Sequence, residues 1–276
     1  MIIVNYCSRG CLFVNISLHP LGKLVCGKQE DMGIEINAVL NRLNCRISNF
    51  SRKLLSINLL DENEREIAPF YARTIFEAAG TAMLARIDPF RVLTVYKVQS
   101  SSNYDVTKRS NIALQWTGDI IAAVKSKDDL WNPENKAADY DRALLSNHVG
   151  DLFWKPSFLN TIDFLYTVNE KSTDWINKLQ QKDETQFFES SKTEAGKLFS
   201  AFSKGVHYEF LVNAESIYDA TTVQDFIMRM LQTISDLGLV SHFGGLMSSC
   251  LEKEEALEYY FQVEEMVQVW RRRMDS

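Results

Sequence analysis

Arg73 and Glu77 are the first pair of residues in this sequence whose spacing points to chemistry. They lie four residues apart in the run from Phe70 to Leu84, so a helix there places both on one face. Their neighbours are apolar or small, and an isolated charge in such surroundings is costly, so we expect the two to form an ion pair. The pair either is buried or half-buried and fixes helix packing, or it lines a polar pocket and binds a substrate.

A second group lies far downstream, where Ser203 and Lys204 stand four and three residues before His207. Helical spacing puts a hydroxyl, a cation and an imidazole on one face. The imidazole could move a proton and the ammonium could hold an anion. The alternative is that His207 is an ordinary packed histidine of a helix.

Arg142 and His148 form a third combination, an arginine followed six residues later by a histidine. Six residues rotate a helix by roughly 240°, so the two side chains do not share a helical face. They can meet only if the helix ends between them, and Gly150 is a residue that permits such an end.

The motifs that are absent restrict the function further. The sequence has no Walker loop, no GxGxxG after a strand, no HExxH, no GxSxG and no kinase signature. Nucleotide hydrolysis, dinucleotide redox chemistry and the common hydrolase mechanisms therefore have no support. The set Cys7, Cys11, His19 and Cys26 matches no usual zinc spacing, so packing is the favoured role for its cysteines, and we expect neither a metal nor a cofactor.

The composition indicates the class of protein that must position these residues. The chain has 276 residues, 30 basic and 36 acidic, with a formal charge of −6, which argues against strong binding of duplex DNA. The low content of turn residues, 12 Gly and 5 Pro, favours a helical fold over a β-sandwich or β-barrel. Five Cys without a CxxC pair suit a reducing cytoplasm, and no apolar run reaches the roughly 20 residues of a membrane span. We expect a cytoplasmic protein without a membrane segment.

Periodicity predicts an all-α helical bundle with long antiparallel helical hairpins. One helix is expected to begin only near Ala68, because Pro69 is tolerated in a first turn. Gly238 is expected to end another. The expected helices cover about 36–56, 68–87, 141–153, 158–166, 191–206, 221–237 and 251–273, with a further helix starting near 172.

Residues 1–31 differ from the rest, because they alternate apolar with polar residues and show no helical period. We predict a short N-terminal extension, locally a strand or hairpin, followed by a helical domain over 32–276. If so, a chain beginning at Met32 keeps its stability.

The Arg-x-x-x-Glu helix at 73–77, followed by Phe202-Ser-x-x-Val-His207, resembles uncharacterised bacterial helical proteins related to the HEPN superfamily, some of them linked to phage defence. The resemblance covers roughly Met32 to Leu211 in layout. Active HEPN ribonucleases carry Arg-x(4–6)-His, in which the pair, brought together across a dimer, acts on the RNA 2′-hydroxyl and phosphate. Only Arg142 to His148 has that spacing in this sequence.

The resemblance implies a defence-associated or toxin-like protein that cleaves or binds RNA, as a metal-independent endoribonuclease if it is an enzyme. The expected catalytic residues are Arg142, His148 and His207, and the expected substrate-binding residues are Arg73, Glu77 and Lys204. Arg73 with His207 is the alternative catalytic pair. The competing hypothesis is a noncatalytic interaction or sensor protein in a larger complex. Expected partners are a protein or a second copy of the chain, with RNA or a nucleotide as ligand.

Overall fold

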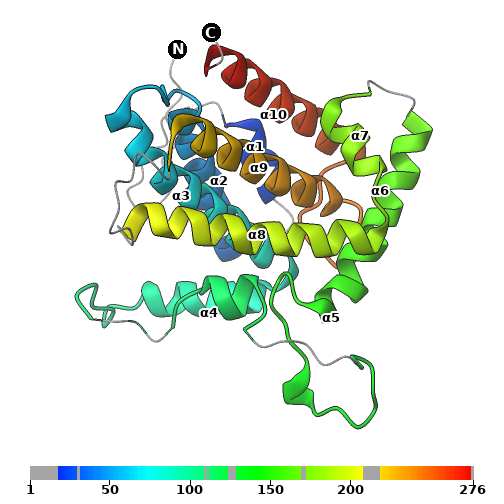
Figure 1. Ribbon diagram of the computed structural model, residues 1–276. Helices are drawn as coiled ribbons and strands as arrows, with labels where there is room; N and C mark the ends of the chain where they lie inside the picture. Colours follow the sequence, from blue (N-terminus) through cyan, green and yellow to red (C-terminus); the bar gives the residue numbers. More distant parts are fainter. Residues whose placement is uncertain are drawn as a thin grey trace, which may run out of the picture.

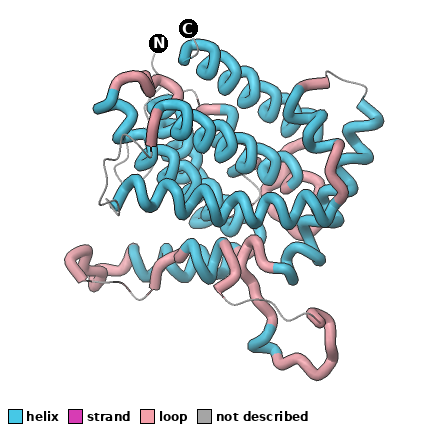
Figure 2. The backbone as a smooth tube through the Cα atoms, viewed as in Figure 1, coloured by secondary structure: helices cyan, strands magenta, loops and turns pink. Residues whose placement is uncertain are grey.

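The computed structural model describes residues 18–29, 32–108, 110, 112–123, 129–168, 172–207 and 218–274. These residues form helices and loops, without a strand (Figures 1 and 2), which confirms the predicted all-α class. The main helices are α1 (Pro20–Cys26), α2 (Ile34–Leu54), α3 (Glu62–Ile87), α4 (Pro89–Gln99), α6 (Lys155–Val168), α7 (Asp174–Gln180), α8 (Glu184–His207), α9 (Ala220–Val240) and α10 (Lys253–Met274). None of them is both long and apolar enough to cross a membrane.

The bundle is built on the expected hairpin of α2 and α3, whose packing against each other is the most extensive in the described residues. α8 and α9 both pack on α3, and α8 crosses the front of the bundle in Figure 1 with α4 below it. One hydrophobic core runs through all these helices, from Leu21 to Trp270. The core therefore joins segments from nearly the whole described length of the chain.

The start of α3 differs from the prediction. The helix begins at Glu62, where the side chain of Asp61 accepts a hydrogen bond from Glu64 N at 3.1 Å, and Pro69 lies inside it. Pro69 is fully buried in the structure and packs beneath α8. Tertiary packing thus outweighs the helix-breaking tendency of an interior proline.

Gly238 does not end α9, which continues to Val240. A Cβ atom added to Gly238 would lie 3.1 Å from Cγ of Leu24 on α1. The glycine therefore permits close approach of two helices instead of providing a stop.

The predicted boundary after residue 31 is wrong for the part that the structure describes; residues 1–17 lie outside it. Residues 20–26 form a helix, not a strand, and α1 packs against α2, α3, α9 and α10. Leu21, Leu24 and Val25 are completely buried. A seven-residue helix leaves too short a pattern to show its period, which is why the sequence did not reveal it.

Arg86, near the end of α3, connects α1 to the rest of the bundle. It is fully buried, and its guanidinium donates to Ser248 O at 3.0 Å, to Val25 O at 3.0 Å and to Ser241 Oγ at 2.8 Å. A fourth bond joins it to Nδ1 of His242 at 3.1 Å. Burial lowers the pKa of Arg86, yet four good acceptors satisfy the group.

His242 completes this junction. Its Nε2 donates to Leu24 O at 2.7 Å, while Nδ1 accepts from Leu251 N at 3.0 Å. Burial, and then the charge of Arg86, lower the pKa of His242 well below its usual value, so the imidazole is neutral. Arg86 and His242 together cap carbonyls in the last turn of α1.

The predicted helix over 141–153 begins later than expected. Asn147–Val149 form one helical turn, with Ser146 as its N-cap, and Gly150–Trp154 form a π-type turn that leads into α6. Residues 141–146 are not helical, and Trp154 Nε1 donates to Leu144 O at 2.7 Å. The bend after residue 146 therefore separates Arg142 from the helix that carries His148.

Candidate functional site: the contact of Arg73 with His207

The structure brings together three of the predicted site residues, from helices far apart in the sequence. Arg73 Nε donates to Glu77 Oε1 at 3.0 Å, and Arg73 Nη1 lies 3.0 Å from Nε2 of His207. Because a guanidinium only donates, His207 Nε2 accepts this bond and the imidazole carries its proton on Nδ1. Among the described residues, Nη2 of Arg73 has no hydrogen-bond partner.

Aromatic rings hold Arg73 in place. The guanidinium lies 5.0 Å from the ring centroid of Phe199, and Trp116 stacks on the same ring at 4.3 Å and 3°. Phe76 supports Trp116 with a centroid distance of 4.8 Å. We did not predict that Phe199 and Trp116 belong to the site, because a stacking contact between residues 83 positions apart leaves no local pattern in the sequence. These residues position Arg73, and a cation over an aromatic face is attractive in itself.

The crossing of α3 and α8 puts His207 beside Arg73. Pro69 lies one turn before Arg73, and Gly205 lies two residues before His207. A Cβ atom at Gly205 would lie 2.9 Å from Cβ of Pro69, so the helices meet at a point where only glycine fits without movement. Pro69, which led to the wrong predicted start of α3, is thus one of the contacts that bring His207 close to Arg73.

Lys204 lies one turn before His207 on the exposed side of α8, where it lines a cavity of about 750 Å³. Three lysines line this cavity, together with Tyr218, Phe226, small or hydroxyl side chains and Ile121, and among the described residues no acidic side chain does. The lysines are Lys192, Lys197 and Lys204. The local charge is therefore positive although the whole chain carries −6.

Arg142 and His148 are not brought together. Arg142 is exposed, whereas His148 is 7% exposed and packs between the rings of Trp131 and Tyr140, with centroid distances of 5.3 and 5.1 Å. His148 Nδ1 accepts a long bond from Asp141 N at 3.4 Å. Of the predicted catalytic residues, His207 alone is accessible beside an arginine.

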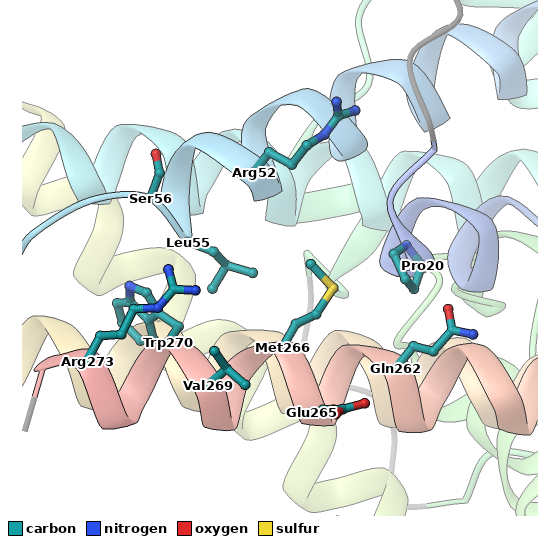
Figure 3. Close-up of a pocket in the computed structure, with 10 residues that line it drawn as sticks. All are labelled: Pro20, Arg52, Leu55, Ser56, Gln262, Glu265, Met266, Val269, Trp270 and Arg273. Carbon is teal, nitrogen blue, oxygen red and sulfur yellow. The ribbon is translucent and has the colours of Figure 1, made fainter.

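A further groove lies between α2 and α10, with a volume of about 570 Å³. Figure 3 shows Leu55 and Met266 between the two helices, with Arg52 on α2 and Arg273 on α10. None of the predicted site residues lines this groove, so we centre the candidate site on Arg73 and His207.

The exposure of the Arg73–Glu77 pair indicates how much it contributes to stability. The side chains are 24% and 47% exposed, so solvent reaches both. We expect Arg73→Ala to lower the free energy of unfolding by less than about 1 kcal/mol, as for other accessible ion pairs. Chemical denaturation of both proteins measures this. A loss of about 3 kcal/mol or more would instead identify a structural pair that the fold requires.

Comparisons with family models, with curated proteins and with solved structures gave no significant match. The resemblance to HEPN proteins stays a prediction, and the function rests on the geometry of the site. That geometry combines an accessible imidazole, a fixed guanidinium whose Nη2 has no partner among the described residues, and neighbouring ammonium groups. Together these groups can bind a phosphodiester and move a proton next to it.

Proposed function

We propose that the protein binds single-stranded RNA along α8 and cleaves it without a metal at His207. The contact between Arg73 and His207, next to the lysines of α8, is the observation that carries this proposal. A guanidinium binds phosphate oxygens in a bidentate manner, and lysines neutralise the neighbouring phosphates. A toxin-like or defence role would follow from such cleavage.

The lining of the cavity favours a single strand over a duplex. It is concave, carries three lysines and has Tyr218 and Phe226 among its walls. Proteins that bind single strands combine such charge with aromatic side chains, whereas duplex binding needs a longer basic surface.

The proposed reaction begins when a phosphate takes the place of His207 at Arg73. Nε2 of His207 is then free to accept the proton of the 2′-hydroxyl. The 2′-oxygen attacks phosphorus, the bond to the 5′-oxygen breaks, and the leaving oxygen takes a proton from water. The hydroxide that remains takes the proton from His207, which restores the neutral imidazole. The products are a 2′,3′-cyclic phosphate and a 5′-hydroxyl. Arg73 and Lys204 stabilise the charge on the phosphorane.

We expect His207→Ala to lower the rate of RNA cleavage by about 10²-fold or more, because a general base contributes 10²–10⁴-fold. Arg73→Ala should lower both binding and cleavage. The measurement uses a fluorescent single-stranded RNA, with anisotropy for binding and gel analysis for cleavage. A DNA oligonucleotide of the same sequence lacks the nucleophile, and should bind without being cut.

Arg142→Ala is the matched control, since it removes an exposed arginine outside the site and should change neither quantity. Slowed growth on expression of the wild type, absent with His207→Ala, would support the toxin-like role. If the wild type binds no RNA, the whole proposal is wrong. If it binds RNA and His207→Ala cuts as fast as the wild type, the assigned catalysis is wrong.

A further inference from the structure

A second cleft, of about 530 Å³, lies on the other flank of α8, between the end of α7, α8 and α9. Every side chain that lines it is polar. The lining residues are Lys178, Gln181, Lys182, Ser190, Ser191, Glu194, Arg229, Gln232, Thr233 and Asp236. A cleft lined by so many hydrogen-bonding side chains suits a small molecule with several polar groups.

Asp236 forms the deepest charged group of this cleft and is only 5% exposed. Tyr260 donates to its Oδ1 at 2.7 Å, and within the described chain its second oxygen has no hydrogen-bond partner. The negative charge of Glu264 raises the pKa of Asp236. Glu264 is itself buried; its Oε1 accepts a hydrogen bond from Trp175 N, and its Oε2 has no partner among the described residues. The free oxygen of Asp236 can therefore accept a hydrogen bond from a cationic group of a ligand.

The charge at the mouth of the cleft has the opposite sign. Lys178 and Lys182 line the α7 side, and both act on Asp236 from a distance. Arg229 is already engaged by Glu194 at 2.6 Å and Asp225 at 2.8 Å. Lys178 forms an ion pair with Asp174, whereas Lys182 has no ion-pair partner among the described residues.

We propose that this cleft binds a free polar α-amino acid, with its ammonium on Asp236 and its carboxylate on Lys182. A simple cation would be repelled by the lysines, and a simple anion by Asp236, whereas a zwitterion matches both charges. The hydroxyls of Ser191 and Thr233 and the amides of Gln181 and Gln232 offer partners for a polar side chain. The cleft leaves room for ordered waters around such a ligand.

The protonation of Asp236 adds support. Burial raises its pKa to about 7, against the lowering effect of Tyr260. An ammonium ligand favours the ionised carboxylate, so binding should release a proton and strengthen from pH 6 to pH 8. The charged and titratable groups around Asp236 are Tyr260 and Glu264 on α10, Lys178 and Lys182 at the end of α7, Glu194 on α8 and Arg229 on α9.

The experiment is isothermal titration calorimetry of the full chain with each of the twenty L-amino acids. We expect L-glutamine or another polar amino acid to bind, while ethylamine and propionate, which each carry one of the two charges, do not. Asp236→Asn keeps the size of the side chain and an acceptor for Tyr260, and should weaken binding at least tenfold. Lys182→Met should weaken it several-fold.

Two controls separate ligand binding from structure. Glu264→Gln alters a buried acid outside the cleft and should bind at least as tightly, because it removes a charge that opposes ionisation of Asp236. Lys197→Met, on the other flank of α8, should bind as the wild type does. Circular dichroism verifies folding of each variant. The proposal is wrong if no amino acid binds, or if Asp236→Asn binds as tightly as the wild type.

Discussion

A chain that begins at Met32 should lack a stable fold. It loses α1, whose Leu21, Leu24 and Val25 are completely buried among four other helices. Burying a large aliphatic side chain contributes about 1.5–3 kcal/mol, so the three together contribute about 5–9 kcal/mol. That is comparable with the whole stability of a typical domain, about 5–15 kcal/mol. Circular dichroism melting of the full and shortened chains measures the difference.

Point substitutions in the full chain provide the control. Leu24→Ala should cost about 2–5 kcal/mol, as for other buried leucines. Leu60→Ala makes the same change at a side chain that is 67% exposed, and should stay within about 0.5 kcal/mol of the wild type. A shortened chain that melts at the temperature of the full one would restore the original prediction of a dispensable extension.

Replacing Arg86 by methionine should lower the free energy of unfolding by about 3–5 kcal/mol. Methionine has similar length but leaves Val25 O and Ser248 O without their donor, and each unsatisfied buried acceptor costs about 1–3 kcal/mol. His242 also loses one of its bonds. For a chain of this size the melting temperature should fall by roughly 10 °C.

Arg86→Lys tests whether geometry or charge is responsible, because one ammonium cannot reach acceptors that surround a planar guanidinium. We expect it to lose most of the same stability. Arg142→Met, at an exposed arginine, should cost no more than about 0.5 kcal/mol. Wild-type stability of Arg86→Met would mean that solvent reaches the carbonyls and satisfies them.

The long amphipathic helices were predictable from their period. The expected helices over 36–56 and 251–273 agree closely with α2 and α10. Errors arose where tertiary contacts override a local rule. Pro69 and Gly238 both lie inside helices, where Pro69 packs against Gly205 of α8 and Gly238 allows α1 to approach closely. α1 was missed because seven residues are too few to display a helical stripe.

The residues of the candidate site were predictable, but the choice between the pairs was not. The sequence offered Arg73 with His207 as the alternative to Arg142 with His148, and a contact across 134 positions depends on how α3 and α8 cross. The motif-like spacing of Arg142 and His148 was misleading, because the helix begins after Arg142 and encloses His148 among aromatic rings. The structural role of Arg86 was not predicted, because the sequence around an arginine in an apolar helix does not show which distant carbonyls it will donate to.

The partners of Arg86 have a consequence for the response to salt. In the part of the chain that the structure describes, the hydrogen-bond partners of Arg86 are uncharged and the Arg86 side chain is fully buried, so mobile ions screen these bonds little. The lysines of α8 face solvent. The affinity of a protein for a single strand falls by about 0.7 logarithmic units per neutralised phosphate for each tenfold rise in salt concentration. If α8 binds RNA as we propose, raising the ionic strength should release the RNA while the hydrogen bonds of Arg86 stay intact, which separates binding from folding in one titration.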